Sequence, residues 1–285
     1  MNRIEINIQK PVIFFMLFLI NIASLFLACE TVKKFISSYY WANGMGYASI
    51  SDWDSSNENY NQAIRLDPNN GRLRFFYGSM LLIAGKIDEG IHQLEKSKKN
   101  FKDIYLYQNL GKSYLDKKMV KESIYHYEKI LQTGIYYSTN LNNLGVVYLN
   151  SGQWDKSIEI FKQVIVIDGN NIEAHENLGL AYLNKEVFEK AVTEFEQALN
   201  LSPGRITTLN NLGVAYMKLK KYDKAIETFN KILTLDNQST VCYNNIGNVF
   251  YLMGNNKKAI TFWKKTLEID PDNQIALHNI KKVTK

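Results

Sequence analysis

The sequence has 285 residues, of which 46% are hydrophobic and 22% charged, and its formal net charge is +6 at pH 7. This composition is typical of a chain that folds and excludes an intrinsically disordered one. Much of the lysine falls in expected turns and second helices, where solvated helix faces explain it, and no nucleic-acid-binding motif accompanies it. Nucleic acid is therefore not an expected partner.

The chain begins with an apolar segment. Residues 12–29 contain no charged side chain. As a helix this segment would span ~27 Å, close to the ~30 Å hydrocarbon core of a bilayer. We therefore expect residues 1–29 to be a signal segment or a membrane anchor, followed by a short linker at 30–36.

Three interpretations of this segment stay open. Cys29 follows Ala28 at the end of the apolar run, an arrangement that resembles a bacterial lipobox and makes Cys29 a candidate lipidation site. An uncleaved signal anchor fits the length of the run, and a cleaved secretory signal is the third alternative. All three predict a membrane-associated location, and a bacterial envelope lipoprotein is favoured over a single-pass membrane protein.

The remainder of the chain repeats itself every 34 residues. Five glycines mark the period, each preceded by Leu or Ile and followed three residues later by Tyr or Phe. Around them, apolar residues recur at spacings of three and four with a break near Ser151 and Gly152, which indicates two amphipathic helices joined by a tight turn. Such a period predicts a solenoid of helical hairpins. The glycines are Gly111, Gly145, Gly179, Gly213 and Gly247.

The repeated glycines call for a packing explanation, because a glycine inside a helix costs roughly 1 kcal/mol relative to alanine. Small residues recur at a second fixed position of the pattern, in the expected second helix. We therefore expect the two helices of each pair to approach closely, so that a side chain at Gly145 would collide with the second helix. The small residues are Ser123, Ser157, Ala191, Ala225 and Ala259.

The pattern resembles the tetratricopeptide repeat. One unit carries nearly all of it, as His175, Leu178, Gly179, Tyr182, Ala191, Phe195, Ala198 and Pro203. The resemblance implies an all-α fold: a right-handed α-solenoid of about seven helix-turn-helix repeats, preceded by the N-terminal apolar anchor helix. The repeats within 37–273 are expected at 37–70, 71–103, 104–137, 138–171, 172–205, 206–239 and 240–273. A capping helix at 274–285 is expected to cover the exposed end with Ile275, Leu277 and Ile280.

No catalytic site is predicted. The four histidines have no metal-ligand spacing, and His175 occupies a position that other repeats fill with packing residues. No phosphate-binding loop or nucleophile elbow occurs. We therefore expect a protein that is not an enzyme, with no cofactor, no metal site and no small-molecule substrate.

Asparagine precedes the Leu-Gly or Ile-Gly pair in five consecutive repeats, and a second polar column runs beside it. A carboxamide can bond to both the N–H and the C=O of an extended peptide. The first column resembles the asparagine ladder of O-linked N-acetylglucosamine transferases, which implies peptide binding in the concave groove; the transferase domain is absent. Bonding between neighbouring repeats is the alternative. The candidate peptide-binding residues are Asn109, Asn142, Asn143, Asn177, Asn210, Asn211, Asn244 and Asn245, with the apolar Val146 and Val214.

These patterns together predict a membrane-tethered, non-catalytic scaffold or adaptor that holds a partner protein or an extended peptide in its groove. The architecture resembles that of bacterial tetratricopeptide lipoproteins, which implies a role in cell-envelope assembly. The alternative is a structural array that uses its convex face or edges to form a homo-oligomer or another complex.

Overall fold

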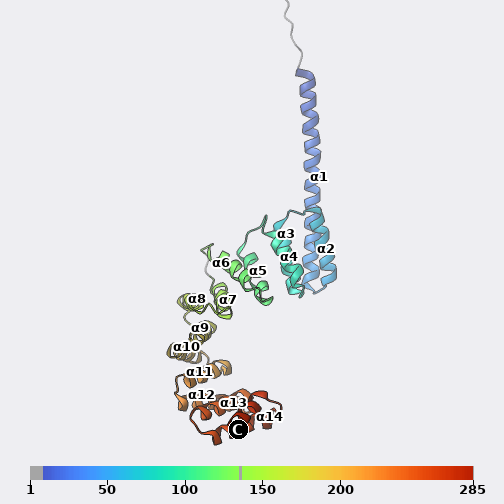
Figure 1. The fold of residues 1–285 in the computed structure, drawn as a ribbon. Helices are drawn as coiled ribbons and strands as arrows, with labels where there is room; N and C mark the ends of the chain where they lie inside the picture. The colour runs from blue at the N-terminus through green and yellow to red at the C-terminus, as the bar shows by residue number, and fades with distance from the viewer. Residues whose placement is uncertain (1–8, 135–136, 285) are drawn as a thin grey trace, which may run out of the picture. The chain divides into compact units, whose positions relative to one another are not determined.

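A computed structural model describes residues 9–134 and 137–284. These residues form fifteen α-helices and no β-strand (Figure 1). The all-α repeat fold expected from the sequence is confirmed. Contacts divide the chain into two units, Met1–Lys117 and Lys118–Lys285, which we call unit 1 and unit 2 and describe separately.

The described residues of unit 1 form two helix pairs and one further helix. Helix α1 packs on α2, α3 packs on α4, and α5 lies against α3 and α4. In its core the rings of Tyr60 and Tyr77 stack with their centroids 5.0 Å apart. The Ser56 hydroxyl donates to the carbonyl of Gly44 at 2.8 Å and so joins α2 to α1. The helices are α1 (Gln9–Ser49), α2 (Trp53–Leu66), α3 (Gly71–Ile83), α4 (Ile87–Ser97) and α5 (Ile104–Asp116).

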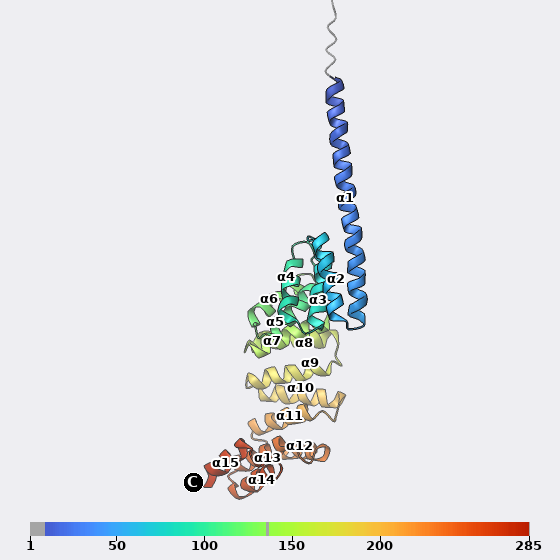
Figure 2. The same ribbon diagram turned by 90° about the vertical axis from the view of Figure 1, so that its right-hand side faces the viewer.

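The described residues of unit 2 form ten helices, which stack in chain order (Figure 2). Its core is centred on the phenylalanines of the second helices, and Phe161, Phe195 and Phe229 are completely buried. The helices are α6 (Val120–Leu131), α7 (Ser138–Asn150), α8 (Trp154–Ile167), α9 (Ile172–Asn184), α10 (Phe188–Leu201), α11 (Ile206–Lys218), α12 (Tyr222–Leu235), α13 (Thr240–Leu252), α14 (Asn256–Ile269) and α15 (Gln274–Thr284).

The close approach predicted at the repeated glycines is confirmed. A Cβ added to Gly145 would lie 2.6 Å from Cε1 of Phe161, and one added to Gly213 would lie 2.5 Å from Cε1 of Phe229. Ser157, one of the small residues of the second helix, donates its hydroxyl to the carbonyl of Gly145 at 2.9 Å. Gly145, Gly179, Gly213 and Gly247 therefore make room for the rings that fill the space between the two helices of their pairs.

Helix α15 packs on α14 through a different set of residues than expected. Ala276 is fully buried beside Trp263, and Ile280 and Val283 lie against the same cluster. Ile280 faces inward as predicted, but Ile275 is 61% exposed and Leu277 is 41% exposed. The cause is helical register, because Ala276 and Ile280 are four residues apart and share one face.

The predicted membrane-associated location is wrong. Among the residues whose side chains the structure describes, no helix has both the length and the apolar character needed to cross a bilayer. The side chains of residues 9–21, 23–25 and 28 lie outside that set. Helix α1 runs from Gln9 to Ser49 without a break, through the region expected as a linker at 30–36. Residues 1–8 of the predicted signal or anchor segment lie outside the described residues.

Cys29, the candidate lipidation site, lies inside this continuous helix and is exposed. The sequence interpretation placed it at the end of a separate apolar segment, whereas the helix continues to Ser49 and pairs with α2. Charged Glu30, Lys33 and Lys34 follow it directly. The envelope-lipoprotein and envelope-assembly hypotheses depended on the membrane location and are not retained.

Candidate peptide-binding face

The first helices of the repeats in unit 2 form one layer, in which α9 contacts α7 and α11, and α11 contacts α13. On α9, Glu173, Asn177, Leu180 and Asn184 are spaced by three or four residues, so they share one face of the helix. That face is open, because Glu173 and Asn184 are exposed and the two residues between them are half-buried. We call the corresponding faces of α7, α9 and α11 together the open face.

Three asparagines of the predicted ladder stand on the open face at equivalent positions. Asn143, Asn177 and Asn211 are half-buried, and their side chains form no hydrogen bond with any residue that the structure describes. Each carboxamide retains two N–H donors and a carbonyl acceptor for an external partner.

The apolar candidates lie one helical turn further along. Val146 and Val214, together with Leu180, are half-buried, and each packs partly against the core of unit 2. Each of the three helices thus presents an asparagine followed three residues later by an aliphatic side chain. Such a surface can hold a polar backbone and a small apolar side chain next to each other.

Four other candidate peptide-binding asparagines have hydrogen-bond partners within their own unit. In unit 2 the Asn245 amide donates to Oδ1 of Asn210 at 2.8 Å, which joins α13 to α11. The Asn244 amide donates to Oδ1 of Asn273 at 3.2 Å. In unit 1 the Asn109 amide donates to the hydroxyl of Ser79 at 2.9 Å, which joins α5 to α3.

Asn142 differs from both groups. It is half-buried, and its Oδ1 is enclosed without a hydrogen-bond partner among the described residues. An enclosed oxygen cannot reach a peptide on the surface. The structure therefore separates the candidate asparagines into three with available carboxamides, four that bond within the protein, and Asn142.

The second polar column also contains a link between repeats that the sequence interpretation missed. Glu176 accepts two hydrogen bonds from the Arg205 guanidinium, at 2.6 and 2.7 Å, and a further one from the hydroxyl of Thr208. The hydrogen bond to Glu176 raises the pKa of Arg205. Glu176 occupies the position of Asn142 and Asn210 in the repeat pattern. Because its carboxylate bonds to Arg205 and Thr208, it links two repeats instead of offering a carboxamide to a peptide.

A second missed link joins tyrosines to glutamates of the preceding repeat. Tyr148 donates to Glu128 at 2.6 Å, and Tyr216 donates to Glu196 at 2.5 Å. Burial raises the pKa of both tyrosines, and the hydrogen-bonded carboxylate raises it further. The signal in the sequence is a spacing of 20 residues between glutamate and tyrosine.

His175 has the packing role expected of it. It is buried, with Nδ1 2.8 Å from a carboxylate oxygen of Glu194 and Nε2 3.2 Å from the carbonyl of Gly169. In the part of the chain that the structure describes, no group of three or more His, Cys, Asp or Glu side chains is arranged to hold a metal ion.

The stacked helix pairs identify the chain as an α-helical repeat protein. Its candidate binding site lies on the surface of the first helices and not in an enclosed cavity. Models of the tetratricopeptide repeat family match residues 42–99, 172–205, 206–239 and 241–273, and a model described as TPR repeat matches 145–186. The chain belongs to the tetratricopeptide repeat family.

Solved structures show the same fold. The crystal structure of MamA protein is 26% identical with a TM-score of 0.55, and the match covers 59% of this chain and 92% of that one. A tetratricopeptide repeat protein from Parabacteroides merdae is 14% identical with a TM-score of 0.63, covering 87% and 99%. A chain of the Cut9–Hcn1 hetero-tetramer of APC/C is 20% identical with a TM-score of 0.58, covering 88% and 54%.

No curated protein matches the chain. The tetratricopeptide fold is typical of scaffolds for protein–protein interaction and is generally non-catalytic. The fold alone does not define what the chain binds, which depends on the residues of its surface.

Proposed function

We propose that the protein is a non-catalytic scaffold that binds an extended segment of a partner protein across the open face of α7, α9 and α11. Asn143, Asn177 and Asn211 hold the backbone of that segment. The observation that carries this proposal is the availability of the three carboxamides, in contrast to those of Asn210, Asn244 and Asn245 in the same unit.

The spacing of the helices supports a backbone ligand. Packed helices lie roughly 8–10 Å apart, and an extended chain advances about 3.3 Å per residue. The step from α7 to α9 therefore corresponds to about three peptide residues. A peptide that reaches all three asparagines would have about seven residues between its first and last contact, both included. Backbone contacts at this interval do not depend on sequence, whereas Val146, Leu180 and Val214 favour small or apolar side chains between them.

The test is a triple substitution of Asn143, Asn177 and Asn211 to alanine in the full chain. Binding is measured by fluorescence anisotropy against a panel of labelled random-sequence peptides of twelve residues. Losing three hydrogen bonds of about 0.5–1.5 kcal/mol each should weaken binding by roughly tenfold to a thousandfold. The melting temperature should stay unchanged, because these side chains bond to no other described residue.

The matched control replaces Asn170, Asn230 and Asn256 with alanine. All three are exposed, and they lie outside the first helices. This control should bind peptides as the parent does, and peptides cut to four residues should lose most of their affinity. Unchanged binding by the Asn143, Asn177 and Asn211 variant would refute the proposal and leave the structural array as the alternative.

A further inference from the structure

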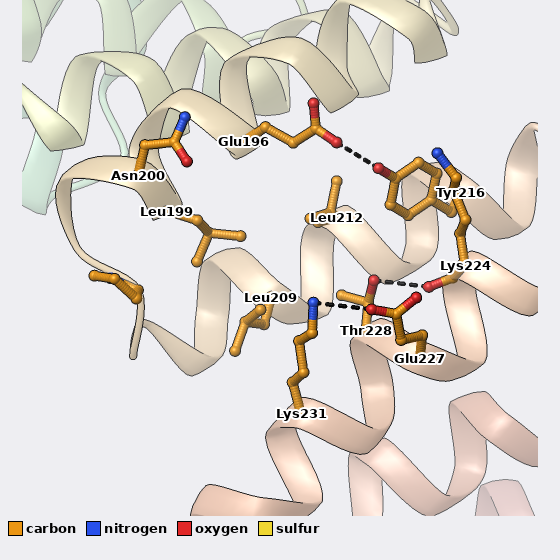
Figure 3. A pocket seen from close by; sticks show the side chains of 11 residues that line it. Glu196, Leu199, Asn200, Leu209, Leu212, Tyr216, Lys224, Glu227, Thr228 and Lys231 are labelled. Atoms are coloured by element: carbon orange, nitrogen blue, oxygen red, sulfur yellow. Dashed lines mark hydrogen bonds and ion pairs between the residues drawn. The ribbon is translucent and has the colours of Figure 1, made fainter.

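A hollow of 530 Å³ lies between α10, α11 and α12, away from the open face. Leu199, Leu209 and Leu212 surround its apolar part, and Lys231 reaches toward Glu227 at its edge (Figure 3). On α11, Leu209 and Asn211 are two residues apart and so point to nearly opposite sides of the helix. The hollow is therefore a separate site from the proposed peptide-binding face.

The flanking repeats show what normally occupies this place. Leu209 is equivalent, at steps of 34 residues, to His175 in the preceding repeat and to Tyr243 in the following one. The preceding repeat places the His175 ring there, and its Nε2 lies 3.2 Å from the carbonyl of Gly169. In the following repeat the Tyr243 hydroxyl donates to the carbonyl of Asn237 at 3.1 Å. Each ring thus reaches the same backbone carbonyl of its repeat junction.

At the hollow the ring is absent and the carbonyl remains. The equivalent of Gly169 and Asn237 is Pro203, which lines the hollow. No residue that the structure describes donates a hydrogen bond to Pro203. Thr228 stands where the following repeat has Phe262, so a second ring is missing as well. The hollow beside Tyr243 is smaller, at 320 Å³.

A lysine completes the comparison. Lys265 of the following repeat lies 5.5 Å above the ring of Tyr243 and 5.6 Å above that of Phe262. Its equivalent is Lys231, which pairs with Glu227 at 3.1 Å at the edge of the hollow. An ammonium group in this position attracts the face of an aromatic ring.

We propose that this hollow binds a tyrosine side chain of a partner protein. The hydroxyl of that tyrosine donates to the carbonyl of Pro203, and its ring packs on Leu199 and Leu212 beneath Lys231. Tyrosine fits better than histidine, because histidine in the preceding repeat relies on Glu194 and the hollow has Thr228 in that place.

A side chain within a protein fits better than the free amino acid. The two carboxylates of the hollow are already engaged, Glu196 by Tyr216 and Glu227 by Lys231. No free carboxylate of the hollow is left to pair with the ammonium group of a free amino acid. A buried tyrosine supplies large contact area at low entropic cost, which is why tyrosine so often anchors protein interfaces.

The test follows methyl signals of the full chain by NMR while N-acetyl-Gly-Tyr-Gly-amide is added. The tyrosine peptide should shift the signals of Leu199, Leu209 and Leu212. The phenylalanine analogue lacks one hydrogen bond and should bind about threefold to tenfold more weakly. The leucine analogue should produce no saturable shift.

Two variants locate the site. The double variant L209Y/T228F rebuilds the rings of the following repeat and should abolish the shifts, whereas Lys231→Met should weaken binding about fivefold. Asn230→Ala, exposed on the same helix, should bind as the parent does. If the double variant does not fold, Lys231→Met decides the question by itself.

Three results would overturn the proposal. They are equal shifts with the tyrosine and leucine peptides, undiminished binding by Lys231→Met, and binding of free L-tyrosine as tight as that of the peptide.

Discussion

The helix pairs α3/α4 of unit 1 and α9/α10 of unit 2 reach close packing by different means. In α9/α10 a Cβ on Gly179 would lie 2.6 Å from Cε1 of Phe195, so an aromatic ring fills the space over the glycine. In α3/α4 a Cβ on Gly78 would lie 2.8 Å from Cγ of Leu94, and one on Gly90 would lie 3.0 Å from the carbonyl oxygen of Gly78. Two glycines there bring the backbones themselves together.

This difference shows what the repeat pattern specifies. The pattern requires a close approach of the two helices of a pair, and either a ring over one glycine or a leucine beside two glycines fits that approach. The repeat at 71–103 therefore forms the same kind of helix pair with Gly78, Gly90 and Leu94 in place of a glycine and a phenylalanine.

The largest effect should come from removing the ring in the α9/α10 pair. Phe195 is fully buried, so Phe195→Ala should lower the free energy of unfolding by about 3–5 kcal/mol. Urea denaturation followed by circular dichroism measures the loss. Gln197→Ala, exposed on the same helix, is the control and should stay within about 0.5 kcal/mol. A loss below about 1 kcal/mol for Phe195→Ala would show that the ring does not hold the pair.

A methyl group on the glycine should have the next largest effect. Alanine favours helices by roughly 1 kcal/mol over glycine, but the collision with Phe195 should make Gly179→Ala destabilising by about 1–3 kcal/mol. Adding Phe195→Leu, the type of residue that α4 uses, should recover part of that loss. The same urea titrations give the coupling between the two substitutions. A stabilising Gly179→Ala would contradict the packing explanation.

The links between repeats extend the comparison to high pH. Glu196 of α10 accepts from Tyr216 at 2.5 Å, whereas Glu95 of α4 accepts from Tyr114 at 3.2 Å. Because the folded pKa of Tyr216 is raised, the unfolded chain loses this proton first, near pH 10, and stability falls as pH rises further.

Tyr216→Phe tests this expectation. It should cost about 1 kcal/mol at neutral pH, through the lost hydrogen bond, and should flatten the decline in stability above pH 10. Urea titrations between pH 8 and about 11 compare the slopes with those of the parent. Parallel curves for the two proteins would mean that Tyr216 does not contribute to the alkaline loss.

The smallest effect should come from the turns. Gly85 between α3 and α4 has φ +78°, and Glu186 at the equivalent turn between α9 and α10 has φ +62°. A non-glycine residue is strained in this left-handed region. Glu186→Gly should therefore stabilise by up to about 1 kcal/mol, and Gly85→Ala should destabilise by a similar amount, both read from melting temperature. Effects of the same sign at the two turns would contradict this assignment.

The sequence predicted the fold well, because packing constraints at Gly145, Gly179 and Gly213 repeat and so become visible in one chain. It could not separate the asparagines. Asn211 and Asn245 occupy the same position in the pattern, but only Asn245 has the Asn210 oxygen within reach. That distinction depends on side-chain geometry between repeats, which period alone does not contain.

The sequence did not reveal the hollow beside Leu209, and it led to a wrong prediction of membrane association. Leu209 is an ordinary apolar residue in the pattern, and the space beside it becomes apparent only against the rings of His175 and Tyr243. The apolar run before Cys29 was interpreted as a separate segment, whereas α1 continues through it to Ser49.

The stacking of unit 2 also has an evolutionary consequence. Its helices pack on their neighbours in the chain, and its first helices pack on one another, so each repeat is held by the repeats beside it. Duplicating residues 172–205 in place would insert one more helix pair and one more copy of Asn177 into the open face. On the proposed function, the bound peptide segment would lengthen by one repeat step through a single duplication within the gene, and the junction between the two copies would be the one new contact between repeats.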